Sequence, residues 1–321
     1  MSPITPPPEG PRRGLSGFWL VGTTVVIYGA SVLAGTGLVV GLFLPLLLTL
    51  IALQYDLRAL AVLLALFVAV AFFVHRGEVQ LWVELGVLAL GLTVLVPFGW
   101  GWFSFPAALW SACAVQAGGV ALFAAVAWLA NGVSPGDWVM ANFDRSTELL
   151  LAQARKEAAT PEAHAALAQL VGRLRAMVGL TYPSLLMINF AVVNLINLQF
   201  LQPVLVAMQP GREPYLFPRR WRVPGRLHWA LLLCVGGVLV DVAAVRAAAA
   251  NGVVGLGFLY LLQGFGLLSH LLARGRVPVV LRTILYGILI ISFQVYPLVA
   301  LVGLAEAFFD MRRLRRPTGG G

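Results

Sequence analysis

The sequence predicts an all-α protein, a polytopic transmembrane bundle whose helices cross a bilayer. Hydrophobic residues make up 60% of the chain and charged residues only 11%. A soluble domain carries more than twice that share of charge, because charge has to cover its surface. The long uncharged stretches point the same way, since a bilayer core of about 30 Å takes roughly 20 helical residues.

Two of these stretches are each long enough for two passes. They run from Arg13 to Asp56 and from Glu84 to Asp137, with no charged residue in between. Two more lie between Arg175 and Arg212 and between Arg246 and Arg274. We therefore expect about eight passes, with a range of about seven to nine.

The N-terminal part divides into a tail and about five passes. Residues 1–16 are rich in proline and polar groups and are expected to form a disordered tail. The apolar run that begins near residue 17 is either a cleaved signal peptide or the first transmembrane helix of residues 17–131. We prefer an uncleaved first helix because the apolar run continues to Tyr55. The passes are expected at about 17–38, 40–55, 57–75, 79–98 and 105–131.

Residues 132–176 form the one sizeable polar segment, and they include an amphipathic helix that starts near Thr160. Apolar residues recur there at helical spacing: Leu167, Leu170, Val171, Leu174, Met177 and Val178. We expect this helix to lie along the membrane surface or to lead directly into the next pass. A helix that binds a partner is the alternative.

Residues 177–311 hold the C-terminal passes, at about 177–208, 228–250, 252–273 and 278–309. Pro297 predicts that the last one is kinked, tilted or split in two. A basic loop at 210–227 includes Arg219, Arg220 and Arg222, which we assign to lipid phosphate, with loop packing as the alternative, rather than to nucleic acid. Residues 312–321 are a basic and then glycine-rich tail, and its arginines favour a cytoplasmic C-terminus.

Polar side chains inside the predicted passes are the candidate functional residues, because such groups are costly in lipid. Asp241 is expected in mid-helix, where it either faces a substrate cavity or pairs with an arginine. The sixth pass is rich in amides, which act either as packing contacts between helices or as a site for an uncharged polar ligand. The candidate substrate-binding residues are Asp241, Asn189, Asn194, Asn197, Gln263 and Tyr182.

Three further charged residues are predicted to make structural ion pairs. They are Glu84, Arg282 and Glu306, each near the end of an uncharged stretch. No nucleotide-binding loop, zinc motif or hydrolase motif occurs in the sequence, so it predicts no ATPase, cofactor or metal site and gives no positive sign of an enzyme.

The C-terminal third resembles a bacterial family of predicted membrane proteins, the YybS-like domain-of-unknown-function family 2232. The resemblance rests on these residues: Leu262–Gly264, His270–Leu272, Pro278, Leu281–Arg282, Leu285–Tyr286, Pro297, Gly303–Glu306, Phe309–Arg312 and the loop Trp221–Pro224. The family is remotely similar to the substrate-binding subunits of energy-coupling-factor transporters, which dock on a shared energising module. The resemblance implies docking through small residues of the first helix, which Ala30 and Ala34 match.

The sequence thus leads to two hypotheses of different kinds. The preferred one is a substrate-binding or permease-like subunit for a small molecule in the bacterial inner membrane. Its partners would be the lipid bilayer, the ligand and a membrane protein or energising module, with no nucleic acid. The alternative is a membrane scaffold that organises envelope proteins, and a membrane enzyme remains the third.

Overall fold

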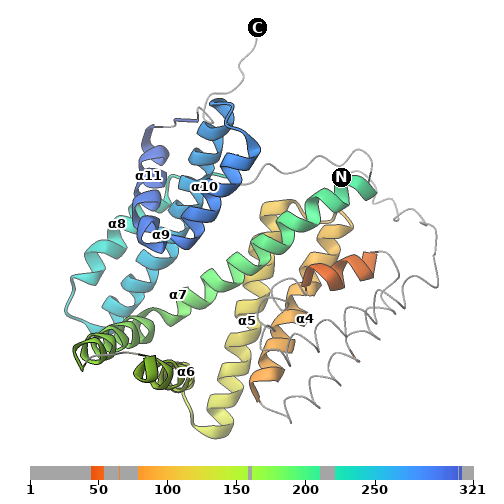
Figure 1. The fold of residues 1–321 in the computed structure, drawn as a ribbon. Helices are drawn as coiled ribbons and strands as arrows, with labels where there is room; N and C mark the ends of the chain where they lie inside the picture. The colour runs from red at the N-terminus through yellow and green to blue at the C-terminus, as the bar shows by residue number, and fades with distance from the viewer. Residues whose placement is uncertain are drawn as a thin grey trace. The chain divides into compact units, whose positions relative to one another are not determined.

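The structure is a computed structural model that describes residues 45–53, 65, 79–157, 161–209, 221–309 and 311–312 (Figure 1). Within these ranges every regular element is a helix, which confirms the predicted all-α class. The chain divides into two compact units. Unit 1 comprises residues 1–132 and 189–214, and unit 2 comprises residues 133–188 and 215–321.

The described part of unit 1 contains helix α4 (Val79–Gly99), helix α5 (Phe105–Asn131) and the second part of helix α7 (Pro161–Met208). A helical segment at 45–53 joins them. Gly132 ends α5 in the left-handed conformation, with φ 70°, and its N–H donates to Trp128 O at 2.8 Å. The core is mostly aliphatic, with buried phenylalanines, and its fully buried side chains include Leu48, Ile51, Leu95, Leu109, Leu198, Leu201 and Leu205.

Unit 2 contains helix α6 (Pro135–Glu157), the first part of α7 and a group of C-terminal helices. These are α8 (Leu227–Val238), α9 (Ala243–Arg274), α10 (Val279–Ile291), the 3₁₀ turn η1 (Phe293–Val295) and α11 (Tyr296–Phe309). Helix α9 packs against both α8 and α11 (Figure 1).

Glycine allows α9 and α11 to approach closely. A Cβ on Gly303 of α11 would lie 1.9 Å from Tyr260 O of α9, and one on Gly264 of α9 would lie 2.1 Å from Val299 O of α11. Both obstacles are backbone carbonyls, which a side-chain rotation cannot move. Small residues give this kind of backbone contact between helices in lipid, where no hydrophobic effect drives helix association.

Polar contacts cap helix α6 and join it to α7. The Ser134 hydroxyl caps α6, because it accepts from Asp137 N at 3.1 Å and donates to the Asp137 carboxylate at 2.6 Å. Arg175 of α7 donates twice to Asp144 of α6, Nε to Oδ1 at 2.8 Å and Nη2 to Oδ2 at 2.9 Å. This hydrogen-bonded ion pair lowers the pKa of the Asp144 carboxyl.

Three of the described helices are long and apolar enough to cross a membrane: Phe105–Ala130 of α5, Ala165–Met208 of α7 and the whole of α9. The expected amphipathic helix near Thr160 is the first part of α7, which continues to Met208. The expected first pass lies outside the described residues, and of the third only residue 65 is described, so the total of about eight stays a prediction.

One expected pass differs from the structure, and another takes a form that the sequence allowed. The predicted pass 228–250 is wrong: α8 ends at Val238, and residues 239–242 separate it from α9. Gly236 and Gly237 explain the break, because adjacent glycines are poor helix formers and the last turn tightens into bonds from Leu239 N and Val240 N to their carbonyls. The last pass is split as expected, with η1 between α10 and α11 immediately before Pro297.

Replacement of Gly303 by alanine is expected to destabilise the protein by about 1–3 kcal/mol, because the new methyl group would overlap Tyr260 O. The matched control is Gly257→Ala on α9, where a Cβ meets nothing within 4 Å. Alanine favours the helix there by up to about 1 kcal/mol. Unfolding of the purified protein, followed by tryptophan fluorescence, measures both variants. Equal effects of the two changes would contradict close packing at Gly303.

The lowered pKa of Asp144 predicts a pH dependence of stability. The ion pair with Arg175 stabilises the fold above the ordinary aspartate pKa, and this contribution is lost as the pH falls through the lowered pKa. We expect Asp144→Asn to remove this part of the decline in melting temperature at acidic pH. Glu148→Gln, elsewhere on α6, serves as the control and should keep the wild-type pH profile. An unchanged profile in Asp144→Asn would contradict the assignment.

Candidate functional site

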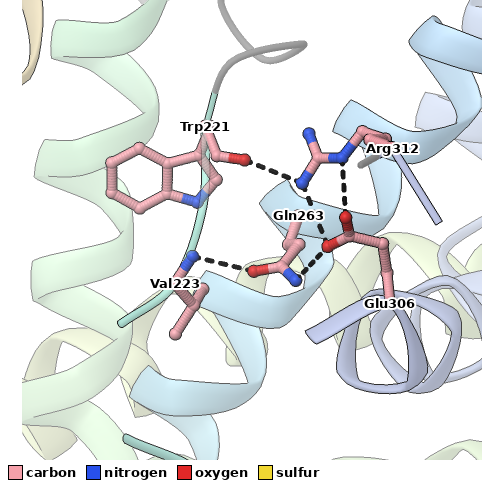
Figure 2. A network of polar contacts seen from close by, with 5 residues as sticks. All are labelled: Trp221, Val223, Gln263, Glu306 and Arg312. Atoms are coloured by element: carbon pink, nitrogen blue, oxygen red, sulfur yellow. Dashed lines mark hydrogen bonds and ion pairs between the residues drawn. The ribbon is translucent and has the colours of Figure 1, made fainter. Parts of the chain in front are cut away.

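A buried ion pair lies among the C-terminal helices of unit 2 (Figure 2). Glu306 is on α11, and Arg312 follows the end of that helix. Arg312 Nε donates to Glu306 Oε1 at 2.9 Å, and its Nη2 donates to Oε2 at 3.0 Å. Glu306 is 1% exposed and Arg312 5%, so the two charges are removed from solvent together.

Neutral groups complete this network. Gln263 of α9 is fully buried, and its amide Nε2 donates to Glu306 Oε2. The Gln263 Oε1 atom accepts from Val223 N at 2.8 Å, while Arg312 Nη2 donates to Trp221 O at 2.8 Å (Figure 2). The segment before α8 is therefore fastened to α9 and α11 by two bonds to its backbone. We assign the network a structural role, because its carboxylate already accepts three hydrogen bonds.

A second polar contact in unit 2 joins α8, α9 and α11. His228 Nδ1 lies 2.5 Å from Tyr260 Oη, and the His228 ring packs against Phe308 with centroids 4.8 Å apart. Tyr260 itself is buried with Val223 and Ala307. The contact positions the start of α8 beside the ion-pair network.

An amide cluster lies in unit 1, and we define it as Asn194 of α7, Gln116 of α5, and their neighbours Cys113 and Gly91. Asn194 Nδ2 donates to Gln116 Oε1 at 2.7 Å, and Cys113 Sγ lies 3.8 Å from the same nitrogen. Asn194 Oδ1 is buried and has no hydrogen-bond partner among the described residues. A Cβ on Gly91 of α4 would lie 2.7 Å from Gln116 Nε2, so glycine provides the room for this amide.

A buried acceptor of this kind is unusual, since buried polar side chains nearly always have partners. Leaving one without a donor costs about 1–3 kcal/mol. The amide cluster carries no ionic group, so its chemistry is hydrogen bonding to a neutral group.

Asn197, one turn further along α7, has both ends of its amide bonded to backbone. Its Nδ2 donates to Val193 O at 2.7 Å, and its Oδ1 accepts from Leu46 N at 2.8 Å. Asn197 therefore holds the helical segment 45–53 against α7.

The structure divides the predicted substrate-binding residues between the two units. Asn189, Asn194 and Asn197 belong to unit 1, and Asn189 is exposed. Tyr182 lies in unit 2 and packs near Gly136 of α6. Gln263 serves the ion-pair network. Of the predicted set, only Asn194 is buried with an unsatisfied atom in the described structure.

The expected mid-helix position of Asp241 is wrong. Asp241 lies in the break between α8 and α9, its side chain is fully exposed, and its Oδ1 is 3.8 Å from Arg246 Nη1. Gly236 and Gly237, which end α8, place the carboxylate outside the helix. Its predicted role in substrate binding stays a prediction.

The predicted ion-pairing residues have different surroundings. Glu306 forms the buried pair with Arg312, whereas Arg282 Nε donates to Val277 O at 2.7 Å. Glu84 lies on α4, and its side chain is outside the described part. Arg222 is half-buried beside the network segment. The remaining predicted residues lie outside the described ranges: Ala30, Ala34, Arg219 and Arg220.

The sequence interpretation missed Arg312 as the partner of Glu306, because Arg312 stands in a cluster of arginines typical of a cytoplasmic end. It also missed Asn251 on α9, whose side chain bonds to Leu180 O and Ser184 N of α7. The signal in the sequence was an asparagine within the uncharged stretch between Arg246 and Arg274. Among the described residues, no group of three histidine, cysteine or acidic side chains could hold a metal ion.

The helices and their buried polar contacts define an integral membrane protein of the α-helical class. The family model described as "Predicted membrane protein (DUF2232)" matches residues 22–307, so the chain belongs to that family. Neither a curated protein nor a solved structure gives a match to the chain.

The buried ion pair predicts a large effect of Glu306→Gln. This change leaves the Arg312 charge buried without its counter-ion and should destabilise the protein by about 3–5 kcal/mol. Arg246→Gln is the control, because the pair of Arg246 with Asp241 is exposed, and we expect no measurable change. Chemical unfolding in detergent measures both. A small effect of Glu306→Gln would show that the network does not fix the C-terminal helices.

Proposed function

We propose that the protein is a membrane-embedded binding or permease-like subunit for a small, uncharged polar molecule. The observation that carries this proposal is Asn194 Oδ1, a buried acceptor with no partner among the described residues. A ligand N–H group placed there would satisfy it and recover the cost of its burial.

The chemistry of the amide cluster narrows the class of ligand. Asn194 and Gln116 offer amide groups, and no ion pair of the described residues belongs to the cluster. A neutral ligand fits such a site, because a charged one would need a counter-ion in a medium of low dielectric constant. Nucleobases and vitamins that carry an amide or imide N–H group meet this description.

The cellular setting is also part of the proposal. The C-terminal arginines support a bacterial inner membrane location with a cytoplasmic C-terminus. The sequence carries no nucleotide-binding loop, so transport would depend on an energising partner. The similarity to energy-coupling-factor subunits stays a prediction, and the proposed docking residues Ala30 and Ala34 lie outside the described part.

A scaffold in the cell envelope is the second candidate, supported by one feature of unit 2. The first part of α7 exposes a stripe of large apolar side chains, formed by Leu170, Leu174 and Met177. Lipid or a protein partner would cover such a stripe.

Ligand binding is tested on the purified full-length protein with a panel of neutral nucleobases and amide-bearing vitamins, with divalent metal ions as comparison. We expect a neutral compound to raise the melting temperature and the metal ions to have no effect. Equilibrium dialysis with that compound should show an affinity about tenfold lower for Asn194→Ala, since one hydrogen bond is lost.

Asn142→Ala is the matched control, because Asn142 bonds to Trp138 O of its own helix and lies outside the cluster. It should bind like the wild type. Binding that survives Asn194→Ala unchanged, or a panel without a binder, would contradict the proposal. Affinity capture of a stable envelope partner without any ligand binding would favour the scaffold.

A further inference from the structure

Helix α7 contains a proline, Pro183, in the middle of its membrane-length stretch. A proline has no N–H to donate to Gly179 O, and its ring crowds that carbonyl. The regular bond from position 183 to Gly179 O is therefore absent, and the ring crowds the turn that contains Leu180 and Ser184, although residues Pro161–Met208 remain one helix. In lipid, groups freed in this way need other partners.

Asn251 of α9 supplies these partners. Its Nδ2 donates to Leu180 O at 2.8 Å, and its Oδ1 accepts from Ser184 N at 3.0 Å. Leu180 O and Ser184 N are the acceptor and donor that pair with each other in a regular α-helix. One side-chain amide thus bridges one turn of a neighbouring helix.

Two more bonds hold the amide in position. Asn251 Nδ2 also donates to Ala247 O of its own helix at 2.8 Å, and Ser184 Oγ donates to Asn251 O at 2.7 Å. We call this set of contacts between Asn251, Leu180 and Ser184 the asparagine latch.

The same arrangement recurs in unit 1. Asn197 Nδ2 donates to Val193 O four residues earlier, and its Oδ1 accepts from Leu46 N, the residue after Pro45. In both places an asparagine bonds to its own preceding turn and takes the N–H that follows a proline. The recurrence shows that one asparagine amide can hold the N–H that follows a proline and a carbonyl of its own helix at the same time.

We propose that the asparagine latch is a reversible hinge lock of α7. When Asn251 bridges Leu180 and Ser184, α7 is held at one bend angle. When the amide leaves, Pro183 permits the two parts of α7 to bend relative to each other. This inference goes beyond ligand binding and does not depend on it.

Exposure makes the lock reversible. The bond from Asn251 Nδ2 to Leu180 O is exposed, and Asn251 is only partly buried. The amide can therefore leave without opening a packed core, and the cost is that of its own few hydrogen bonds. The buried Gln263–Glu306 contact cannot open in this way and is a poor place for a switch.

Pulsed electron paramagnetic resonance on the full chain in lipid nanodiscs tests the proposal. Cys113 and Cys234 are replaced by alanine, and spin labels are placed at the exposed positions of Leu170→Cys and Phe200→Cys, on either side of Pro183. In the wild-type background we expect one dominant distance, with the unlatched form below about 10% of molecules.

Asn251→Ala is expected to raise the unlatched form to a share comparable with the latched form, seen as a second or broadened distance. Asn142→Ala is the matched control, because Asn142 makes the same bond to its own helix, to Trp138 O at 2.8 Å. It should leave the distance distribution unchanged.

The decisive variant is Pro183→Ala combined with Asn251→Ala. Alanine restores the N–H at position 183, so α7 can complete its own bonding and a single distance should return. A single distance in Asn251→Ala alone, or a distribution as broad in the double variant, would overturn the proposal.

If Asn251→Ala does not fold, Ser184→Ala gives the same test, because it removes one latch bond and keeps the backbone N–H. It should produce a smaller shift in the same direction, and the absence of any shift would count against the latch.

Discussion

The need to satisfy backbone groups inside lipid is the constraint on which the rest of this structure depends. Side-chain amides meet it at several places where a described helix ends or contains a proline. Gln209 Nε2 donates to Gly99 O at the end of α4, and Gln263 Oε1 accepts from the segment before α8. Asn197 and Asn251 do the same beside Pro45 and Pro183. An amide is suited to this task because it offers a donor and an acceptor without charge.

Each such bond contributes little by itself, on average about 0.6 kcal/mol between membrane helices. An asparagine that makes several of them therefore changes the energy of a conformation by on the order of 2 kcal/mol, which is the scale on which conformational equilibria are balanced. The buried pair of Glu306 with Arg312 belongs to another energy range, since loss of one partner leaves a desolvated charge. In unit 2 the buried ion pair therefore forms the rigid contact, and the neutral asparagine bonds form the contact that can open.

Sequence patterns predicted a helix well where its bounds are set by the length of an apolar run. The span expected at 105–131 has the bounds of α5, and the interruption before Pro297 follows from the proline. The patterns also marked Asn194, Asn197 and Glu306 as special, because polar groups are costly in lipid. They could not give the partners: Arg312 returns to Glu306 only through the turn after α11, and Asn251 acts through a proline on another helix. Asp241 was misplaced because hydrophobicity outweighed the two glycines that end α8.

Asn194 differs from these other amides, and the proposed function rests on that difference. Gln209, Gln263, Asn197 and Asn251 each bond to backbone atoms, and in Asn197 and Asn251 both ends of the amide do so. Asn194 uses its nitrogen on Gln116 and keeps a buried oxygen without a described partner. The bond from Asn194 to Gln116 joins α7 to α5, as amides between membrane helices commonly do, and it leaves one acceptor over. Under the proposed function, an incoming hydrogen-bond donor would give the Asn194 oxygen the partner that the other amides find within the protein.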